Sequence, residues 1–320
     1  MRLLITGGAG FIGSNFIRYT LRKYPACKII NLDKLTYAGN PENLHDLRRN
    51  KNYSFVKGDI CESKLVEKLI DKCGYVINFA AATHVDRSIK DPLDFVKTNV
   101  FGTYVLLEAC RKAKPKLFLQ ISTDEVYGSI LKGRAKETDA LLPNSPYAAT
   151  KAAGDCLARS YFVTYGVPVI TSRCTNNFGP YQYPEKVIPL FITNLLENRK
   201  VPLYGDGGNR RDWIYVIDNC KAIDTILRKG KIGEIYNIAG GNEIPNVALT
   251  KKILRLMKKN DSFIQYVKDR PGHDRRYALD CAKLKSLGWE SEFSFDKALA
   301  LTVDWYGNNP DWWKKLKEPF

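Results

Sequence analysis

The sequence has 320 residues, of which 44% are hydrophobic, and it contains no run of about 18 uncharged apolar residues. This length and composition predict one large α/β unit with an attached lobe, and they argue against a membrane-spanning helix. The first residues, MRLLITGGAG, are predicted to form a buried strand and not a signal peptide.

The net charge is +16, but the basic residues are spread along the chain, so we interpret them mainly as a solvated surface. A smaller role of this positive charge would be to attract an anionic substrate toward its cleft. The eight cysteines lie at positions 27, 61, 73, 110, 156, 174, 220 and 281, without a Cys-x-x-Cys pair. This scatter argues against a disulfide framework or a metal site and predicts reduced thiols in the cytoplasm.

Apolar strands alternate with helices of regular periodicity in the first half of the chain. Strands are predicted at residues 2–8, 28–33, 53–59, 75–81, 116–123 and 168–174, and helices at residues 9–24, 62–72, 92–113 and 146–166. This alternation predicts an α/β fold with a Rossmann-type, doubly wound parallel sheet.

A glycine-rich turn follows the first predicted strand. Gly7, Gly10 and Gly13 are spaced G-x-x-G-x-x-G, and Asp33 ends the next strand about twenty residues later. Such a turn lets a pyrophosphate approach the backbone at a helix N-terminus, and the Asp33 carboxylate would accept ribose hydroxyls. The pattern predicts a dinucleotide site that prefers NAD to NADP. The alternative is a structural turn with an exposed aspartate.

Tyr147 and Lys151 lie one turn apart on the helix predicted at residues 146–166. An ammonium group beside a phenol stabilises the phenolate and lowers its pKa. The pair is therefore a candidate base that removes a hydroxyl proton while a hydride leaves for NAD. The alternative is an ordinary surface pair.

Two adjacent acids, Asp124 and Glu125, follow the strand predicted at residues 116–123. Ligands of open α/β sheets bind at the carboxyl ends of the strands. Two neighbouring carboxylates raise one pKa, so that one group stays an acid while the other acts as a base. Elimination of water beside a carbonyl group needs such a pair. The alternative is a strand end with solvated acids.

The second half of the chain has a less regular pattern. Residues 1–175 are predicted to form the NAD-binding domain, to which residues 209–242 return. Residues 176–208 and 243–320 are predicted to form a smaller C-terminal lobe that binds the substrate.

Longer motifs cover the whole chain and carry a family resemblance. They are STDEVYG, PYAATK, LDKLTYAGN at 32–40, THVDRSI at 83–89, RCTNNFGPYQYPEKVIPLF at 173–191, YGDGGNRRDWIYVID at 204–218, DRPGHDRRYALD at 269–280 and TVDWYGNNPDWW at 302–313. Together they resemble the nucleotide-sugar 4,6-dehydratases of dTDP-glucose, which belong to the extended short-chain dehydrogenases/reductases. The resemblance implies a hydro-lyase with bound NAD that converts dTDP-glucose to the 4-keto-6-deoxy sugar nucleotide.

The resemblance also assigns roles to the five candidate catalytic residues. Tyr147, helped by Lys151, would be the base for oxidation at C4, and Thr123 would hydrogen-bond the C4 oxygen. Glu125 would remove the C5 proton, and Asp124 would protonate the departing C6 hydroxyl. The hydride would then return to C6.

Two sets of binding residues follow from the same resemblance. The residues implied around NAD are Gly7, Gly10, Phe11, Ile12, Gly13, Asp33, Lys34, Leu35, Thr36, Asp59, Ile60, Ala80, Ala81, Ala82, Thr98, Tyr147, Lys151 and Asn177. Those implied around the substrate are Thr83, Thr123, Asn176, Lys186, Val187, Leu190, Pro202, Tyr204, Arg211, Asn246, Arg270 and His273. Arginines suit the diphosphate. Lys186 could instead lie at the surface, and His273 could be a solvated loop residue.

Two positions depart from the family pattern: Thr83 stands where serine is frequent, and Ala82 where glutamate is frequent. Asn99 either orients the helix that carries Tyr147 or satisfies nearby backbone. The helices at 92–114 and 146–165 suggest a homodimer, as in related proteins. The final deoxysugar, dTDP-rhamnose or another, stays open.

Three other functions were weighed. An epimerase or a UDP-glucuronate decarboxylase would share Tyr147 and Lys151 but would not need Asp124. A 4,6-dehydratase of UDP-, CDP- or GDP-sugars would differ only in its base pocket. A non-catalytic NAD-binding or RNA-associated protein would suit the charge, but it would be expected to lack part of the catalytic set. No nucleic-acid or membrane partner is predicted.

Overall fold

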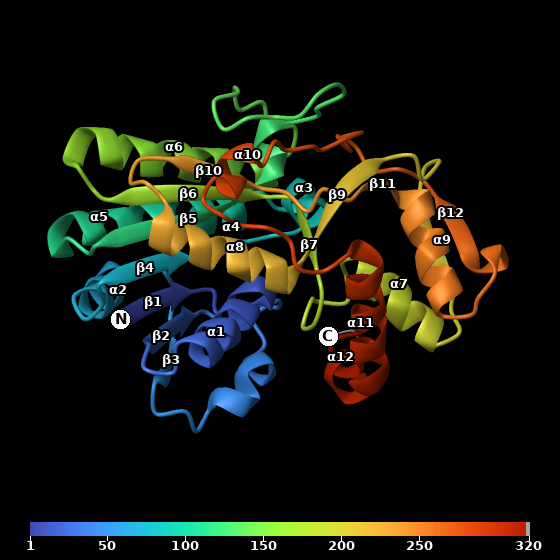
Figure 1. The fold of residues 1–320 in the computed structure, drawn as a ribbon, viewed down its shortest axis with the longest axis horizontal. Helices are drawn as coiled ribbons and strands as arrows, with labels where there is room; N and C mark the ends of the chain where they lie inside the picture. The colour runs from blue at the N-terminus through green and yellow to red at the C-terminus, as the bar shows by residue number, and fades with distance from the viewer. Residues whose placement is uncertain (318–320) are drawn as a thin grey trace.

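The computed structural model describes residues 1–317 and contains a seven-stranded parallel sheet between two layers of helices (Figure 1). The strand order is β10-β6-β5-β4-β1-β2-β3. The strands are β1 (Arg2–Thr6), β2 (Lys28–Asp33), β3 (Tyr53–Lys57), β4 (Tyr75–Asn78), β5 (Leu117–Thr123), β6 (Val169–Cys174) and β10 (Ile235–Ile238). The predicted doubly wound sheet is confirmed.

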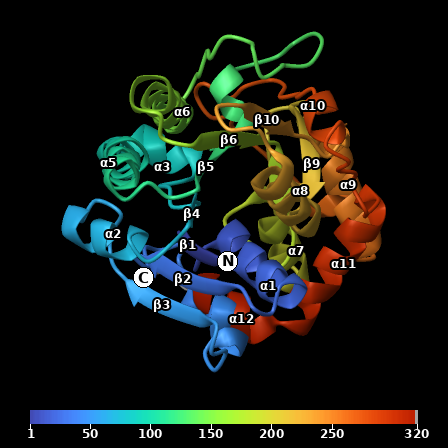
Figure 2. The same ribbon diagram turned by 60° about the vertical axis from the view of Figure 1, so that its left-hand side comes forward.

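Helices cover both faces of this sheet (Figure 2). One face carries α1 (Phe11–Lys23) and α8 (Val216–Lys229), and the other carries α2 (Ser63–Ile70), α5 (Thr103–Ala113) and α6 (Pro146–Tyr165). Every residue of the central strand β5 is buried. Such burial on both faces explains why its sequence, LFLQIST, is nearly continuous in apolar character.

The helix α6, which carries Tyr147, has clear local signals at both ends. Ser145 caps it by accepting a hydrogen bond from the Ala148 N–H at 3.1 Å, and Pro146 occupies its first turn. Gly166 ends it with φ of 68°, a left-handed conformation that suits glycine. The helix predicted at 146–166 is therefore confirmed within one residue.

The helix predicted at residues 92–113 is interrupted in the structure. It consists of the short α4 (Leu93–Phe95), a π-helical segment Val96–Gly102 and then α5. Wider turns of this kind are rare and often lie at functional sites. Here the widened segment carries Asn99, whose contacts with the site are described below. Before it, α3 (Val85–Lys90) follows β4.

The smaller lobe is built around two small sheets and lies on the right in Figure 1. Strands β7 (Asn176–Phe178), β9 (Arg210–Tyr215) and β11 (Glu243–Pro245) form one sheet, and β8 (Val201–Tyr204) and β12 (Ile264–Val267) form the other. The helices of the lobe are α7 (Val187–Leu196), α9 (Asn246–Leu256), α11 (Phe295–Asn308) and α12 (Pro310–Lys317), whereas the short α10 (Ala282–Lys285) lies beside β10 of the main sheet. Short 3-10 helices span Pro41–Leu47, which is kinked at Leu44, Asp124–Tyr127 and Asp261–Phe263.

The segment 209–242 corrects one prediction. Strand β10 joins the main sheet beside β6, but β9 pairs with β7 and β11 in the small sheet. An apolar run reports burial and does not identify the neighbouring strand, so the sequence could not separate the two cases. The division into an NAD-binding domain and a lobe otherwise stays a prediction, and residues 318–320 lie outside the described residues.

Candidate active site

A deep cleft of ≈ 920 Å³ opens at the carboxyl ends of the strands of the main sheet. This volume is typical of a site that encloses a small organic ligand. All five candidate catalytic residues line it: Thr123, Asp124, Glu125, Tyr147 and Lys151. The residues predicted around NAD line it too, except Leu35, whose N–H instead bonds the Asp33 carboxylate at 2.8 Å.

The glycine turn after β1 has no space for side chains at Gly7 and Gly13, because neighbouring backbone lies too close. Gly7 has φ of 67°, and a Cβ atom there would lie 2.6 Å from the Ala80 backbone. A Cβ atom on Gly13 would lie 2.5 Å from the Gly7 carbonyl oxygen. Gly10 immediately precedes α1, whose first N–H groups face the cleft end of the sheet. These residues therefore fit the pyrophosphate of a dinucleotide.

Asp33 is buried, and burial raises the pKa of its carboxyl group. Its two oxygens accept the N–H groups of Ala9 at 2.9 Å and Leu35 at 2.8 Å, which fixes the carboxylate at the end of β2. Nearby, Lys34 pairs with Asp59 at 2.8 Å. This arrangement places two carboxylates where the adenosine half of a dinucleotide would lie.

Asn99 connects two walls of the cleft. Its Nδ2 donates to the Ala82 carbonyl at 3.1 Å and to Thr150 Oγ1 at 3.0 Å, and its Oδ1 accepts the Ala82 N–H at 2.9 Å. Thr150 lies on α6 between Tyr147 and Lys151. Both roles considered for Asn99 are thus present, because the amide satisfies backbone and also holds the helix of the catalytic pair.

Tyr147 and Lys151 point into the same part of the cleft, with Cys174 nearby. Lys151 is buried and donates to the Ile121 carbonyl at 2.6 Å, and burial lowers its pKa. The pKa of Tyr147 is raised well above its usual value by burial and by the carboxylates of Glu125 and Asp124. The pKa of the phenol therefore shifts in the direction opposite to the predicted lowering, because burial and the two carboxylates favour the neutral phenol.

Asp124 and Glu125 start the 3-10 turn at the end of β5, and they lie in different environments. Burial and the neighbouring Glu125 raise the pKa of Asp124 well above its usual value. Burial also raises the pKa of Glu125, but the positive charges of Arg211, Arg270 and Lys186 oppose this. The pair can therefore hold one proton on Asp124 while Glu125 is ionised.

The predicted substrate residues form two groups. Thr83, Thr123, Asn176 and Lys186 line the cleft. Val187, Leu190, Pro202, Tyr204, Arg211, Asn246, Arg270 and His273 lie outside that lining, on or beside the elements of the smaller lobe. Of these eight residues, Arg211 and Arg270 act on the cleft through their positive charges, which lower the pKa of Glu125.

The arginines of the lobe are already oriented. Arg211 is buried, donates to the Asp274 carbonyl at 2.8 Å and lies 4.3 Å from the centre of the Tyr277 ring. Arg270 pairs with Asp86 of α3 at 3.4 Å. His273 is not solvated, because its side chain is only 7% exposed and its Nδ1 lies 2.6 Å from Asp269. Burial also lowers the pKa of Lys186, which excludes a fully exposed surface lysine.

Strand β9, which carries Arg211, is held at its start by Glu243. The Glu243 carboxylate accepts hydrogen bonds from Arg210 and Arg276, each at 2.7 Å, and these partners lower its pKa from 4.5 to about 2. We expect Glu243→Gln to cost about 1–3 kcal/mol of unfolding free energy at neutral pH. Because the pKa of Glu243 is lower in the folded protein, its ionised carboxylate stabilises the fold fully above about pH 4.5. This stabilisation is lost as the pH falls toward about 2.

Thermal unfolding of wild type and Glu243→Gln at several pH values measures this effect. The difference between the two proteins is expected to be largest near neutral pH and to shrink below about pH 4.5. The control is Glu67→Gln, which removes an exposed pair with Lys112 and is expected to change stability by about 0–1 kcal/mol. A Glu243→Gln difference that does not vary with pH would contradict the assignment.

Among the cleft-lining residues that the sequence interpretation missed are Tyr37, Arg87, Cys174 and Glu185. Each lies inside a motif that was quoted for its resemblance, but its partners come from distant parts of the chain. Burial raises the pKa of the Cys174 thiol to about 12, so this cysteine is a packing residue. No sequence spacing signals such contacts.

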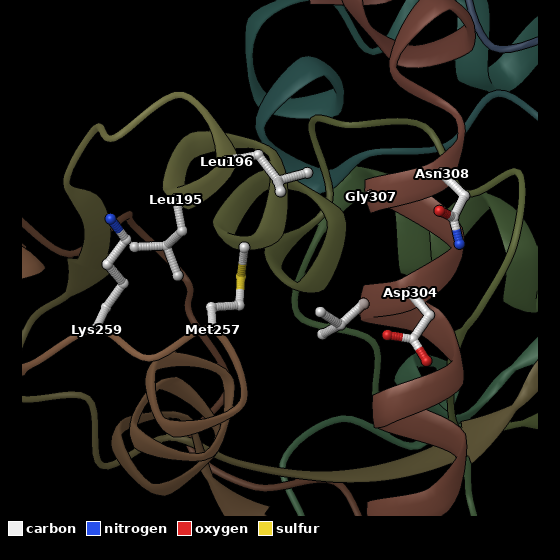
Figure 3. Close-up of a pocket in the computed structure, with 8 residues that line it drawn as sticks. Leu195, Leu196, Met257, Lys259, Asp304, Gly307 and Asn308 are labelled. Carbon is white, nitrogen blue, oxygen red and sulfur yellow. The ribbon is translucent and has the colours of Figure 1, made fainter.

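A second, shallower hollow lies between the C-terminal ends of α7 and α9 and the helix α11 (Figure 3). Leu195, Met257 and Asp304 are among its lining residues, and none of the predicted site residues line it. Within residues 1–317, no group of three His, Cys, Asp or Glu side chains could hold a metal ion. In the same range, no helix is long and apolar enough to cross a membrane.

The sheet, the glycine turn and the Tyr147–Lys151 pair together define a short-chain dehydrogenase/reductase. The family model described as GDP-mannose 4,6 dehydratase matches residues 4–302, and the chain belongs to this family of nucleotide-sugar dehydratases.

Relatives of known name match over the full length. The chain is 49% identical to the dTDP-glucose 4,6-dehydratase of Streptomyces niveus, over 100% of this chain and 96% of the relative. It is 51% identical to the low-salt glycan biosynthesis protein Agl12 of Haloferax volcanii, over 96% of this chain and 98% of the relative.

Solved structures agree with this placement. The dTDP-glucose 4,6-dehydratase DesIV from Streptomyces venezuelae, crystallised with NAD, matches with a TM-score of 0.97 and 48% identity, over 99% of this chain and 100% of that one. The UDP-glucose 4-epimerase of Thermus thermophilus, also in complex with NAD, matches with a TM-score of 0.90 and 32% identity, over 97% and 100%.

Proposed function

We propose that this protein is an NAD-dependent dTDP-glucose 4,6-dehydratase, which converts dTDP-glucose to dTDP-4-keto-6-deoxyglucose and water. The observation that carries this proposal is the pair Asp124 and Glu125, which lie side by side in the cleft: burial raises the pKa of both, and the positive charges of Arg211, Arg270 and Lys186 oppose this rise at Glu125. Oxidation alone needs only Tyr147 and Lys151, whereas elimination of water needs an acid and a base as well. The dehydratase relatives support the same reaction.

The cofactor residues are proposed from the fit of the cleft. The glycine turn would receive the pyrophosphate, Asp33 the adenosine ribose and Asp59 the adenine edge, with Ala80 to Ala82 and Asn177 near the nicotinamide. Bound NAD would supply a hydride acceptor, whose positively charged ring favours the phenolate of Tyr147, and a hydride donor for the last step.

Tyr147 starts the reaction in this proposal. Its phenolate takes the proton of the C4 hydroxyl while the C4 hydride leaves, and C4 becomes a ketone. The Thr123 hydroxyl donates to Asp124 Oδ1 at 3.1 Å and lies close to the Tyr147 phenol, so it can hold the C4 oxygen at the same point. Lys151 keeps a positive charge close to this oxygen.

Asp124 and Glu125 then remove water. The C4 ketone makes the C5 proton acidic, and the ionised Glu125 takes it. Asp124, whose raised pKa keeps it protonated, gives its proton to the C6 hydroxyl, which leaves as water. Return of the hydride to C6 and of the proton from Glu125 to C5 completes the 4-keto-6-deoxy sugar and restores the cofactor. Tyr147 then gives the proton of the former C4 hydroxyl to solvent and Asp124 takes one up, so that the phenolate and the acid pair are ready for the next turn.

The direct test uses purified protein without added NAD. Incubation with dTDP-glucose is expected to give the alkaline chromophore of a ketosugar, because the cofactor stays bound and is regenerated in each turn. A parallel incubation with UDP-glucose tests the nucleotide base. Product from UDP-glucose alone would replace the proposed substrate, and no product from either would refute the dehydratase function.

The epimerase is the second candidate, because an epimerase structure shares the fold at a TM-score of 0.90. An epimerase returns the hydride to C4 and does not remove water. A product that still carries its C6 hydroxyl would favour this candidate. Asp124, which is buried and whose pKa is raised well above its usual value by burial and by Glu125, favours the dehydratase because such a group suits a general acid.

We also propose that the protein is a cytoplasmic homodimer. Its cysteines are unpaired, which suits a reducing compartment. Apolar side chains are exposed along the π-helical segment, α5 and α6, among them Phe101, Tyr104, Val163 and Tyr165. Exposed large apolar side chains of this kind are typical of an interface, and two such helices from each copy would pack as four helices.

A charge placed on this face is expected to separate the subunits. Val163 is 63% exposed, so Val163→Glu leaves the fold intact but would bury a carboxylate in the interface. Sedimentation equilibrium is expected to report a monomer where wild type is a dimer. The matched control is Ile232→Glu, since Ile232 is 45% exposed outside these helices. A wild-type monomer, or a dimer that survives Val163→Glu, would contradict the proposed interface.

A further inference from the structure

Three segments from distant parts of the chain meet above the dinucleotide cleft. Tyr37 lies on the loop after β2, Thr83 lies on the segment after β4, and Glu185 precedes α7 in the smaller lobe. The Tyr37 hydroxyl lies 3.1 Å from the Thr83 carbonyl oxygen and 3.0 Å from Glu185 Oε1, so one hydroxyl faces two acceptors. We call Tyr37, Arg87 and Glu185 the strap.

Arg87 of α3 completes the strap. Its guanidinium lies 3.8 Å from the centre of the Tyr37 ring, and its Nε and Nη2 donate to Glu185 Oε2 at 3.3 and 3.2 Å. The Tyr183 ring contacts Tyr37 edge-on, with ring centres 5.5 Å apart. The Glu185 side chain is only 17% exposed, so its charge is compensated by Arg87 in a sheltered position.

The sheet order determines what the strap covers. Strand β1 lies between β4 and β2, and the glycine turn follows β1 (Figure 2). A contact between the segments after β4 and after β2 therefore crosses above that turn. Tyr37, Thr83, Arg87 and Glu185 all line the same cleft as Gly7, Gly10 and Gly13. A dinucleotide seated on the glycine turn would lie beneath these residues.

We propose that Tyr37, Arg87 and Glu185 retain NAD by closing over its pyrophosphate, and that their contacts must open before the cofactor can leave. This inference rests on the proposed function, because an enzyme that takes and returns the same hydride has no need to exchange its cofactor. The strap also joins the cofactor domain to the lobe through Glu185, which neighbours the proposed substrate residue Lys186.

The test measures exchange of the cofactor in the intact protein. Wild type, Tyr37→Phe and Glu185→Gln are loaded with radiolabelled NAD and chased with unlabelled NAD. Each variant is expected to release the label about tenfold faster than wild type, the scale set by loss of one sheltered hydrogen bond or charge contact. Less NAD is expected to remain bound after gel filtration. The control, Glu67→Gln, removes an ion pair between α2 and α5 and is expected to exchange like wild type.

A double variant tests whether the residues act together. The single variants Tyr37→Phe and Arg87→Met are compared with the double variant that carries both changes. If one strap holds the cofactor, the double variant releases NAD at about the rate of the faster single variant, because both changes open the same contact. Unchanged exchange in Tyr37→Phe and Glu185→Gln would overturn the strap. Faster exchange in a protein that makes no ketosugar would leave the strap in place and refute the dehydratase. Unchanged NAD exchange in variants that form the ketosugar normally would overturn the strap and leave the dehydratase function in place.

Discussion

The double variant Asp124→Asn with Glu125→Gln is expected to reduce its bound NAD slowly on addition of dTDP-glucose and to release almost no 4-keto-6-deoxy product. Tyr147, Lys151 and Thr123 remain in place, so oxidation at C4 is still supported. The elimination loses both its acid and its base. Each positioned acid or base contributes about 10²–10⁴-fold, so product formation is expected to fall by about 10⁴-fold or more.

Two signals follow this variant: the absorbance of the reduced nicotinamide and the alkaline chromophore of the ketosugar. The first is expected to rise after substrate is added and the second to stay at background. Glu290→Gln, at an exposed position, is the matched control and is expected to behave as wild type in both. Undiminished product in the double variant would refute the roles of Asp124 and Glu125.

Tyr147→Phe is expected to lower turnover by about 100-fold or more, because the C4 hydroxyl loses its base. The phenylalanine ring keeps the edge contact with Phe95, whose ring centre lies 6.3 Å away, so the helix should stay in place. This variant is blocked one step earlier than the double acid variant. Reduced nicotinamide is therefore not expected to accumulate after substrate is added.

Single-turnover absorbance measures this step directly. The raised pKa of Tyr147 means that the phenolate fraction grows with pH, so the wild-type rate of cofactor reduction should rise as the pH increases toward that pKa. Tyr147→Phe is expected to lose this dependence. Tyr165→Phe, at the exposed end of the same helix, is the control. A near-wild-type rate in Tyr147→Phe would place the base on another residue.

Much of the site could be predicted because its residues lie at strand ends. The glycine turn after β1, Asp33 after β2 and the acids after β5 are read from local patterns, and a parallel sheet brings all strand ends to one edge. The pair Tyr147 and Lys151 shares one helix face, so its geometry is also local. The cleft contains all of these residues for that reason.

Contacts between distant segments could not be predicted in the same way. The pairing of β9 with β7 and β11, the interrupted helix around Asn99 and the buried position of His273 all depend on residues far away in the chain. The raised pKa of Tyr147 has the same origin, because the carboxylates that raise it come from another element. Local spacing carries no information about such neighbours.

The amino-acid sequence by itself predicted the doubly wound sheet, the dinucleotide turn and the candidate pairs Tyr147–Lys151 and Asp124–Glu125, since these follow from periodicity and from short spacings along one element. The separate roles of the two acids came from the family resemblance. Only the tertiary structure showed how burial and neighbouring charges shift the pKa of each acid, which lobe arginines act on Glu125, and how Tyr37, Arg87 and Glu185 contact one another at the cleft. The physical reason is that burial and charge at a point depend on every segment packed around it, whereas a helix or a strand depends mainly on its own residues.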